Sequence, residues 1–404
     1  MAKPRKPRRR SKVALVCAGG GVTGALYEIG CLHALDELLE GGVADFDLYV
    51  GVSGGAFVSS LLAAGITPAE MYDAVTSGEG DALGVADAPL YRLGLADFFT
   101  ASRRAPGLLR RAAAAALRGD VSTFSDLAWS LFELLPAGLL DNSGLQEYVE
   151  ALIRSRGRKD RFDALRRPLL VVAVDLDDGD AIAFGDARHR EVPVSRAVQA
   201  STALPGLYRP VRIGDRDFID GGVKKTAHIH LAIDAGADLV LCVNPIVPIH
   251  NDARGGPFDG HLSARGITYV LDQALRIMLH GRMQYGMERY RREYPQVDIL
   301  LMEPTRDDLR MFSYHIMRNG VRRIVAEHGY QSVRQHFTTH FAPYRRMLAR
   351  HGITLRHPRT VPSRPASRPR TSAVARALSG TLRDLEASLA GRPRPRRAAA
   401  RSAR

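Results

Sequence analysis

The sequence predicts an α/β protein with a mostly parallel central sheet flanked by helices, together with a helical insertion and a helical C-terminal part. Three observations predict this class. Apolar segments recur along the chain, the segment at 168–176 is continuous as in a strand buried on both faces, and helical patterns separate most of the segments. Repeated strand–helix units favour parallel pairing with helices on both faces of the sheet.

The first two units lie at the N-terminal end. Residues 13–17 (VALVC) form a short apolar run that ends in glycines, and apolar residues then recur at helical spacing from Gly24 to Leu39. A second strand is expected at 46–52, followed by a small apolar helix at 54–64. Each unit therefore has the order strand, glycine turn, helix.

Residues 66–165 differ in composition and are expected to form a mostly helical insertion over the edge of the sheet. They contain an alanine-rich run at 108–119 and an apolar patch at 127–140 with Trp129 and Phe132. We favour ordinary helix packing for this patch over a lid that docks on lipid.

The α/β pattern then resumes. After the strand at 168–176, a helix should end at Pro205, and VRIGDRDFID should form a hairpin closed by Gly214 and Asp215. A helix at about 226–235, strands at 238–245 and 297–303, and helices at 260–293 and 307–337 complete the pattern. The helix at 260–293 carries one apolar face, formed by Ile267, Val270, Leu271, Ala274, Leu275 and Met278.

The excess positive charge lies in two terminal segments. The 404 residues have a net charge of +14, of which residues 1–12 contribute +7 and residues 351–404 contribute +11, so the body has a net charge of −4. We therefore expect a disordered basic tail at 1–12, a folded domain at 13–345, and an Arg/Pro-rich tail at 346–404 with a short amphipathic helix at about 372–390. A near-neutral body argues against a specific nucleic-acid partner.

The composition also bears on location and cofactors. No stretch of about 18 uncharged apolar residues occurs, so a membrane-spanning helix is not expected. The three cysteines show no CxxC spacing, which indicates neither a disulfide framework nor a zinc site. We expect a cytoplasmic protein without cofactor or metal, with peripheral contact to an anionic membrane or lipid surface through the basic tails as an open alternative. Pairing of the amphipathic tail segment with a partner helix is another, and the oligomeric state is not predicted.

The motif GVSGG places Ser53 between Gly51 and Gly55 in a G-x-S-x-G pattern. Ser53 falls at the junction of a predicted strand and a predicted helix, where a sharp turn presents a nucleophilic hydroxyl above a sheet edge. An ordinary glycine turn is the alternative, because five-residue matches are common by chance.

A second glycine motif, GGGVTG, spans Gly19 to Gly24 and joins the first strand to the first helix. Unpaired N–H groups at a helix N-terminus can stabilise a developing oxyanion, and parallel neighbouring strands would bring this loop to the side of Ser53. The motif also matches a dinucleotide-binding pattern, but the acidic ribose ligand expected at the end of the second strand is absent.

A nucleophilic serine needs a base. A Ser-Asp-His arrangement is disfavoured, since only one strand–helix unit precedes Ser53 and the 13 histidines form no obvious motif. His228 and His230, near the start of a helix, are better explained as structural residues. Asp220 in FIDGG is the preferred base, because it ends a hairpin strand and Gly221 and Gly222 leave room for another loop.

Taken in order, GGGVTG, GVSGG, ASTALPGLYRPV and DGG resemble the patatin-like phospholipase family over roughly residues 13–245. The resemblance implies a lipid acyl hydrolase, of the phospholipase A or lysophospholipase type, with a lipid ester as substrate. It further implies Ser53 as nucleophile, Asp220 as base and an oxyanion hole, with supporting glycines in the same motifs. The hole would be formed by Gly19, Gly20 and Gly21, and the supporting glycines are Gly24, Gly51, Gly55, Gly221 and Gly222.

The sequence departs from the family pattern at two places. Thr23 stands where the glycine loop commonly carries a basic residue, and VKKTAHIH follows DGG in place of an Asn-x-Pro pattern. A catalytically silent lipid-binding or scaffold protein of the same fold is therefore the main alternative. A nucleotide-binding enzyme is the third.

Overall fold

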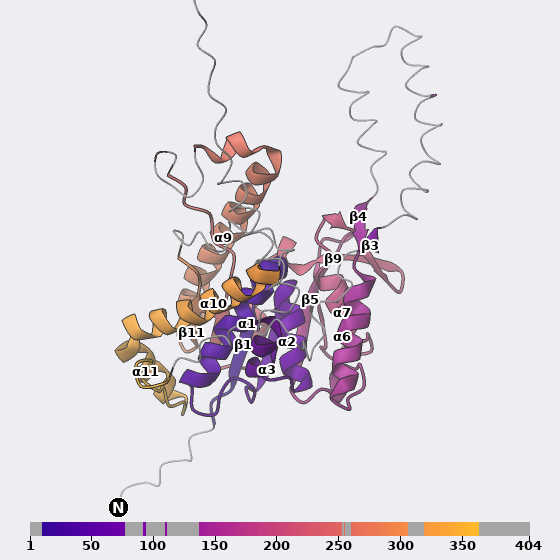
Figure 1. The fold of residues 1–404 in the computed structure, drawn as a ribbon. Coiled ribbons are helices and arrows are strands. Elements are labelled where there is room, and N and C mark those ends of the chain that lie inside the picture. Colours follow the sequence, from indigo (N-terminus) through magenta and orange to yellow (C-terminus); the bar gives the residue numbers. More distant parts are fainter. Residues whose placement is uncertain are drawn as a thin grey trace, which may run out of the picture.

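The computed structural model describes residues 10–76, 92–93, 110, 137–252, 254, 260–305 and 319–362. Within these residues a central sheet has the strand order β11-β10-β1-β2-β5-β9-β8, with β6 beside β5. The first five strands pair in parallel, whereas β6, β8 and β9 pair antiparallel. The expected α/β class with a mostly parallel sheet is confirmed, and Figure 1 shows helices on both sides of the sheet.

The strands of this sheet coincide closely with the apolar segments of the sequence. They are β1 (Val13–Cys17), β2 (Leu48–Val52), β5 (Leu169–Asp175), β6 (Ala181–Phe184), β8 (Val211–Ile213), β9 (Arg216–Asp220), β10 (Leu239–Val243) and β11 (Asp298–Met302). The hairpin is closed at the predicted glycine, because Gly214 has φ +63° and Ile213 pairs with Arg216.

The helices largely follow the predicted periodicity. They are α1 (Gly21–Leu38), α2 (Gly54–Ala64), α3 (Pro68–Thr76), α6 (Ser143–Ser155), α7 (Val194–Ser201), α8 (Ile229–Asp234), α9 (Ile267–Glu293), α10 (Asn319–Thr339) and α11 (Phe341–Arg350), with short 3₁₀ turns η1 (Phe162–Ala164), η2 (Gly221–Val223) and η3 (Leu262–Arg265). Helix α1 begins three residues earlier than expected, so the glycine motif itself forms the first turn.

Alternating strand residues pack into two cores, one on each face of the sheet. Leu15 and Tyr49 face the larger core with α1, α2 and α10, whereas Val16 and Val50 face the smaller core with α8 and α9. Helices α1 and α10 approach each other closely at Gly30. A side chain at this position would overlap the Ala326 carbonyl, so glycine is what permits the approach. Both faces of the sheet are thus covered, and only its edges remain for a site.

Two strands meet end to end beside β5. Val52, the last residue of β2, pairs with Val172, and Asp220, the last residue of β9, pairs with Ala173. Strand β6 occupies the other edge of β5 at these positions, so β2 and β9 lie along the same edge. Because β2 runs parallel and β9 antiparallel to β5, their carboxyl ends point at each other.

One described part of the insertion is a strand where the sequence predicts a helix. Gly138–Asp141, at the end of the apolar patch 127–140, is strand β4 and not helix, and it forms a second sheet with β3 (Arg92–Leu93) and β7 (Gly206–Tyr208). The physical reason is pairing, since the backbone of Gly138 approaches Tyr208 and Arg209 so closely that a side chain would overlap them. The alanine-rich run apart from residue 110, and the patch at 127–136, lie outside the described residues.

The folded body extends past residue 345. Helix α11 continues to Arg350, Leu355 pairs with Leu39, and Arg334 donates hydrogen bonds to the carbonyls of Pro358 and Val361. The expected amphipathic segment at 372–390 and residues 1–9 lie outside the described residues. In the described part of the chain, no helix combines the length and the apolarity needed to cross a membrane.

Candidate active site

Ser53 occupies a tight turn between β2 and α2. It has φ +53° and ψ −125°, and among the described residues it is the one non-glycine with positive φ. Such a conformation costs about 1–3 kcal/mol and is typical of serines presented on a strand-to-helix turn. A Cβ at Gly51 would lie 2.5 Å from the Cα of Ala56, and one at Gly55 would overlap the Cys17 carbonyl. The glycines of GVSGG are therefore required by close packing of backbone on backbone.

Ser201 anchors this turn from α7. The backbone N–H of Ser53 donates to Ser201 Oγ at 2.9 Å, and Ser201 Oγ donates to the Val172 carbonyl at 2.6 Å. Ser201 is fully buried. The sequence pattern ASTALPGLY contains this residue but gives it no role, and only the tertiary contact identifies it.

The glycine loop lies beside the serine turn. It follows β1, the parallel neighbour of β2, and an added Cβ at Gly19 would lie 3.4 Å from the Cβ of Ser53. The N–H of Gly19 donates to the Thr226 carbonyl at 3.2 Å, whereas the N–H groups of Gly20 and Gly21 have no hydrogen-bond partner within the described residues. Both stand at the N-terminus of α1, where a positive dipole end favours an anion. Two of the three expected donors are thus available to a ligand.

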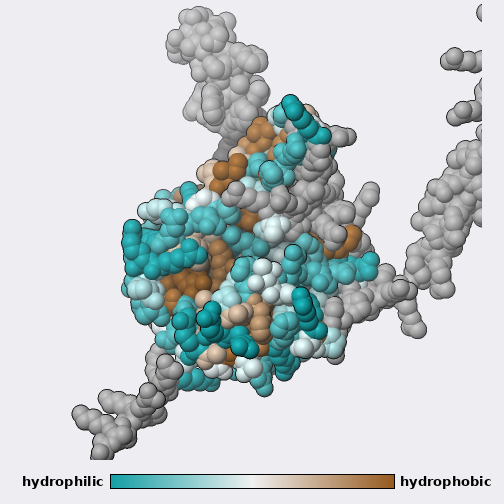
Figure 2. Space-filling view, turned by 90° about the vertical axis from the view of Figure 1, so that its left-hand side faces the viewer, coloured by the Kyte–Doolittle hydropathy of each residue, from teal (hydrophilic) through white to brown (hydrophobic). Residues whose placement is uncertain are grey.

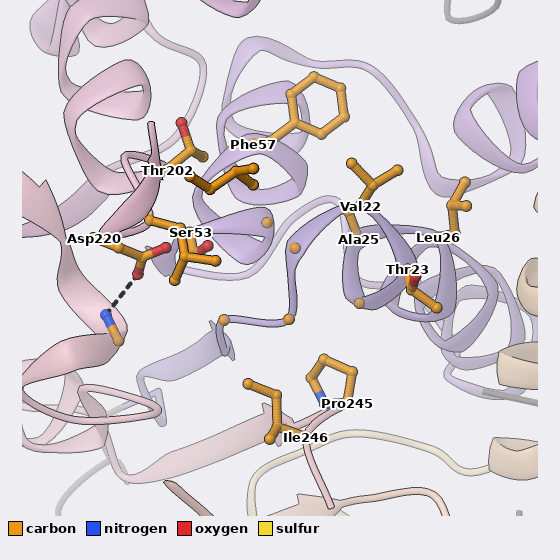
Figure 3. Close-up of a pocket in the computed structure, with 18 of the residues that line it drawn as sticks. Val22, Thr23, Ala25, Leu26, Ser53, Phe57, Thr202, Asp220, Pro245 and Ile246 are labelled. Carbon is orange, nitrogen blue, oxygen red and sulfur yellow. Dashed lines mark hydrogen bonds between the residues drawn. The ribbon is translucent and has the colours of Figure 1, made fainter. Parts of the chain in front are cut away.

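Asp220 reaches Ser53 from the end of β9. Figure 3 shows the two side chains next to each other, with the dashed line marking the bond from Gly222 N–H to Asp220 Oδ1 at 2.8 Å. Ser53 is 6% exposed and Asp220 is 3% exposed. Burial raises the pKa of Asp220 from 3.8 to about 6, although hydrogen bonds from the Ser53 hydroxyl and the Gly222 N–H act in the opposite direction. The carboxyl group is therefore a stronger base than a solvated aspartate.

The loop after Asp220 is held by residues that differ from the family pattern. A side chain at Gly221 would overlap the Val172 carbonyl, so the loop presses against β5. The buried His228 contacts the Gly221 carbonyl through Nε2 at 3.3 Å. Burial, with a smaller contribution from His230, lowers the pKa of His228 to about 3, which keeps the ring neutral near pH 7. The neutral ring therefore contacts the loop that follows Asp220, and the structural role of His228 stays a prediction.

A cavity of about 390 Å³ is lined in part by Ser53 and Asp220. Apolar side chains from distant segments line it, and this volume is within the usual range for small-molecule sites. Figure 3 shows Phe57, Val22 and Leu26 around the space, with Pro245 and Ile246 below the glycine loop. Gly24 packs against Pro245, where a Cβ would lie 2.9 Å from the proline ring. The shape and lining suit a hydrocarbon chain.

Thr23 is the residue of the glycine loop at which the resemblance leads us to expect a basic side chain. Thr23 lines the cavity on α1, away from Ser53 and Asp220 in Figure 3. Arg276 is a cation in the lining, and its Nε donates to Asp272 at 2.7 Å. Among the described residues there is no group of three or more His, Cys, Asp or Glu side chains that could hold a metal ion.

Comparisons with known proteins bear on the family of the chain. The family model described as patatin-like phospholipase matches residues 15–233. Protein YqhO of Bacillus subtilis is 24% identical over 218 residues, which cover 52% of this chain and 62% of YqhO. The NTE family protein Mb2594 of Mycobacterium bovis is 27% identical over 232 residues, which cover 57% of this chain and 30% of that protein. The chain therefore spans less than two thirds of the length of either relative.

A solved structure, VipD from Legionella pneumophila, aligns with 82% of this chain and 67% of its own at 13% sequence identity and a TM-score of 0.38.

Proposed function

The chain belongs to the patatin-like phospholipase family, and we propose that it is a lipid acyl hydrolase of the phospholipase A or lysophospholipase type. Family membership supports lipid acyl hydrolysis in general terms. The finer proposal concerns Ser53 as nucleophile, Asp220 as base, and the N–H groups of Gly20 and Gly21 as the oxyanion hole. The observation that carries it is the contact between a strained serine and a buried aspartate in the lining of an apolar cavity.

The chemistry would proceed in two steps. Asp220 accepts the proton of Ser53 as Oγ attacks the ester carbonyl, and Gly20 and Gly21 donate to the oxyanion. The tetrahedral intermediate collapses, the leaving alcohol takes the proton from Asp220, and the acyl group remains on Ser53. Asp220 then accepts a proton from water as the water oxygen attacks the acyl-enzyme carbonyl. When this second tetrahedral intermediate collapses, Ser53 Oγ leaves and takes the proton from Asp220, which releases the fatty acid and regenerates both groups.

Burial suits Asp220 to this role. A pKa of about 6 lies much closer to neutral pH than that of an exposed aspartate, so the group is ionised near pH 7 and still holds a proton effectively during transfer.

Gly19 is not one of the oxyanion donors in this proposal. Its N–H bond to Thr226 joins the glycine loop to the loop that follows Asp220, which supports their spacing.

The test is hydrolysis of a lipid panel by wild-type protein with Ser53→Ala as the blank. Ser53→Ala and Asp220→Asn should each reduce hydrolysis by about 10³-fold or more, since each removes a reacting group. A fluorophosphonate probe should label the wild type and not Ser53→Ala. Wild-type protein that binds lipid but neither hydrolyses any ester nor reacts with the probe would be an inert lipid-binding member of the fold, and the proposal would be wrong.

A further inference from the structure

Helix α9 has two halves with opposite surroundings. Its C-terminal half is anchored in the smaller core by Met283, Met287 and Tyr290. Its N-terminal half, from Ile267 to Met278, projects away from the body, as Figure 1 shows. The sequence indicates an apolar face for this half, and such faces normally pack against a core. The structure leaves it in contact with solvent.

One face of this half carries several large, apolar and exposed side chains. Ile267 is 68% exposed, Leu271 is 61% exposed and Met278 is 56% exposed, and Leu275 also belongs to this stripe. Figure 2 shows hydrophobic side chains gathered at the top of the molecule. Scattered exposed leucines are ordinary, but several on one helix face indicate an interaction surface.

Towards the C-terminal end of α9, the residues in line with the stripe change from apolar to Arg and Tyr. At three- and four-residue spacing, Met278 is followed by Arg282, Tyr285 and Arg289, with Tyr285 70% exposed. Arg and Tyr side chains combine an apolar stem or ring with a polar end and favour the boundary between hydrocarbon and water. An apolar end next to Arg and Tyr matches the layers of a lipid surface, with acyl chains beyond headgroups. A water-soluble protein partner would not require this order.

The stripe is continuous with the catalytic cavity. Leu275 belongs to the stripe and also lines the cavity, and the buried Leu279 follows one turn later in the lining. Arg282 donates from Nη1 to the Val223 carbonyl at 2.7 Å, two residues after Gly221. Lys224 and Lys225 follow directly and add positive charge beside Arg282. A lipid leaving a membrane at this helix would therefore reach Ser53 along apolar side chains.

We propose that the outward stripe of α9 (Ile267, Leu271, Leu275, Met278) docks the protein on the surface of an anionic lipid bilayer. The apolar end enters the acyl-chain region, and Arg282 contacts anionic headgroups. The cavity, which Leu275 lines, then lies next to the source of substrate. This inference rests on the proposed function, because it assigns the way in which lipid reaches that site.

The experiment uses the full chain and two adjacent residues of nearly equal exposure. Met278→Glu places a charge in the stripe, whereas Ile277→Glu places the same charge about 100° around the helix, on a side chain that is 54% exposed. Flotation with phosphatidylglycerol-containing vesicles is run in 0.5 M salt, which screens attraction by the basic tails. Met278→Glu and Leu271→Glu should each weaken vesicle binding about tenfold or more, and Ile277→Glu should bind as wild type does.

Hydrolysis of a soluble ester provides the second readout, since none of these three side chains lines the cavity. Both stripe variants should keep this activity and lose hydrolysis of vesicle lipids. Equal vesicle binding by Met278→Glu, Ile277→Glu and wild type would overturn the proposal. So would a wild-type dimer that Leu271→Glu dissociates without loss of vesicle binding, because the stripe would then be a contact between copies. Failure of the hydrolase proposal would instead abolish ester hydrolysis in every variant while leaving the flotation result intact.

Discussion

The serine side and the aspartate side of the site are held in place by different means. Ser53 is fixed by backbone packing, since side chains at Gly51 and Gly55 would overlap neighbouring backbone atoms. Asp220 is held by hydrogen bonds, from Gly222 N–H to its carboxylate and from its own N–H to the Ala203 carbonyl. Gly221 on the aspartate side is closely packed as well, but the residues after DGG contribute side-chain contacts such as that of His228 with the Gly221 carbonyl, and such contacts can be made by various side chains. A departure from the family pattern after DGG is thus structurally easier than one within GVSGG.

The largest expected effect is on the serine side. Gly55→Ala would place a methyl group against the Cys17 and Ala18 carbonyls, which belong to the buried end of β1 and cannot shift without disrupting the sheet. We expect a loss of about 4 kcal/mol or more in the free energy of unfolding, together with loss of activity. Denaturant unfolding measures it.

Gly281→Ala is the matched control. It lies within α9 with nothing within 4 Å of the added methyl group, so alanine should stabilise the protein by about 0.5–1 kcal/mol. Similar denaturation midpoints for the Gly55 and Gly281 variants would show that the serine turn is not fixed by packing.

The next effect is a pH-dependent one on the aspartate side. The pKa of Asp220 is raised from 3.8 to about 6 in the folded protein, so the folded state binds more protons than the unfolded state between these values. Stability from this group is therefore lost as the pH rises through this window. Asp220→Asn should be more stable than wild type by about 3 kcal/mol at pH 8, from about two pH units at 1.36 kcal/mol each, and the difference should shrink towards pH 4.

Ser53→Ala is the control, because it removes the nucleophile but keeps the buried carboxylate. Its stability should retain a pH dependence close to that of the wild type. The wild-type kcat/KM should rise with pH around 6, as Asp220 ionises. A constant stability difference between Asp220→Asn and wild type from pH 4 to pH 8 would contradict the raised pKa.

A smaller effect is expected where the two sides share a support. Ser201→Ala would leave the Ser53 N–H and the Val172 carbonyl without their partner, at a cost of about 1–3 kcal/mol in stability. A displaced serine should also reduce kcat by about tenfold to a hundredfold. Ser60→Ala is the comparison, since Ser60 Oγ donates only to Phe57 within α2. If both variants keep wild-type kcat, Ser201 does not position Ser53.

Much of the site could be predicted because its signals are local. The order strand, glycines, helix places the loop at 19–21 and Ser53 at adjacent strand ends without knowledge of the rest of the fold. The approach of Asp220 could not be derived in this way, since it depends on β2 and β9 meeting along one edge of β5. The role of Ser201 could not be predicted either, because nothing in its local sequence distinguishes it from other serines in helices.

The exposed half of α9 shows a different limit. Periodicity gave the helix correctly, and the apolar face lies where the spacing puts it, but an apolar stripe does not state what covers it. The strand at 138–141 shows the same limit at short range, because a leucine-rich segment suits a helix or a strand until its pairing partner is known.

The smallest expected effect tests the hydrogen bonds on the aspartate side. His228→Ala removes the contact with the Gly221 carbonyl, but this contact is long, and Nδ1 of the ring has no partner among the described residues, so the loss should be about 1 kcal/mol. As a positioning residue, His228 should affect kcat by less than about tenfold and leave KM unchanged. His228→Gln can still donate to the same carbonyl and should restore most of kcat. The apparent pKa of the rate profile should stay near 6 in all variants, because a ring with a pKa of about 3 does not titrate there. A profile that shifts with His228→Ala would instead make the histidine part of the proton transfer, and the two sides of the site would then be joined by chemistry as well as by geometry.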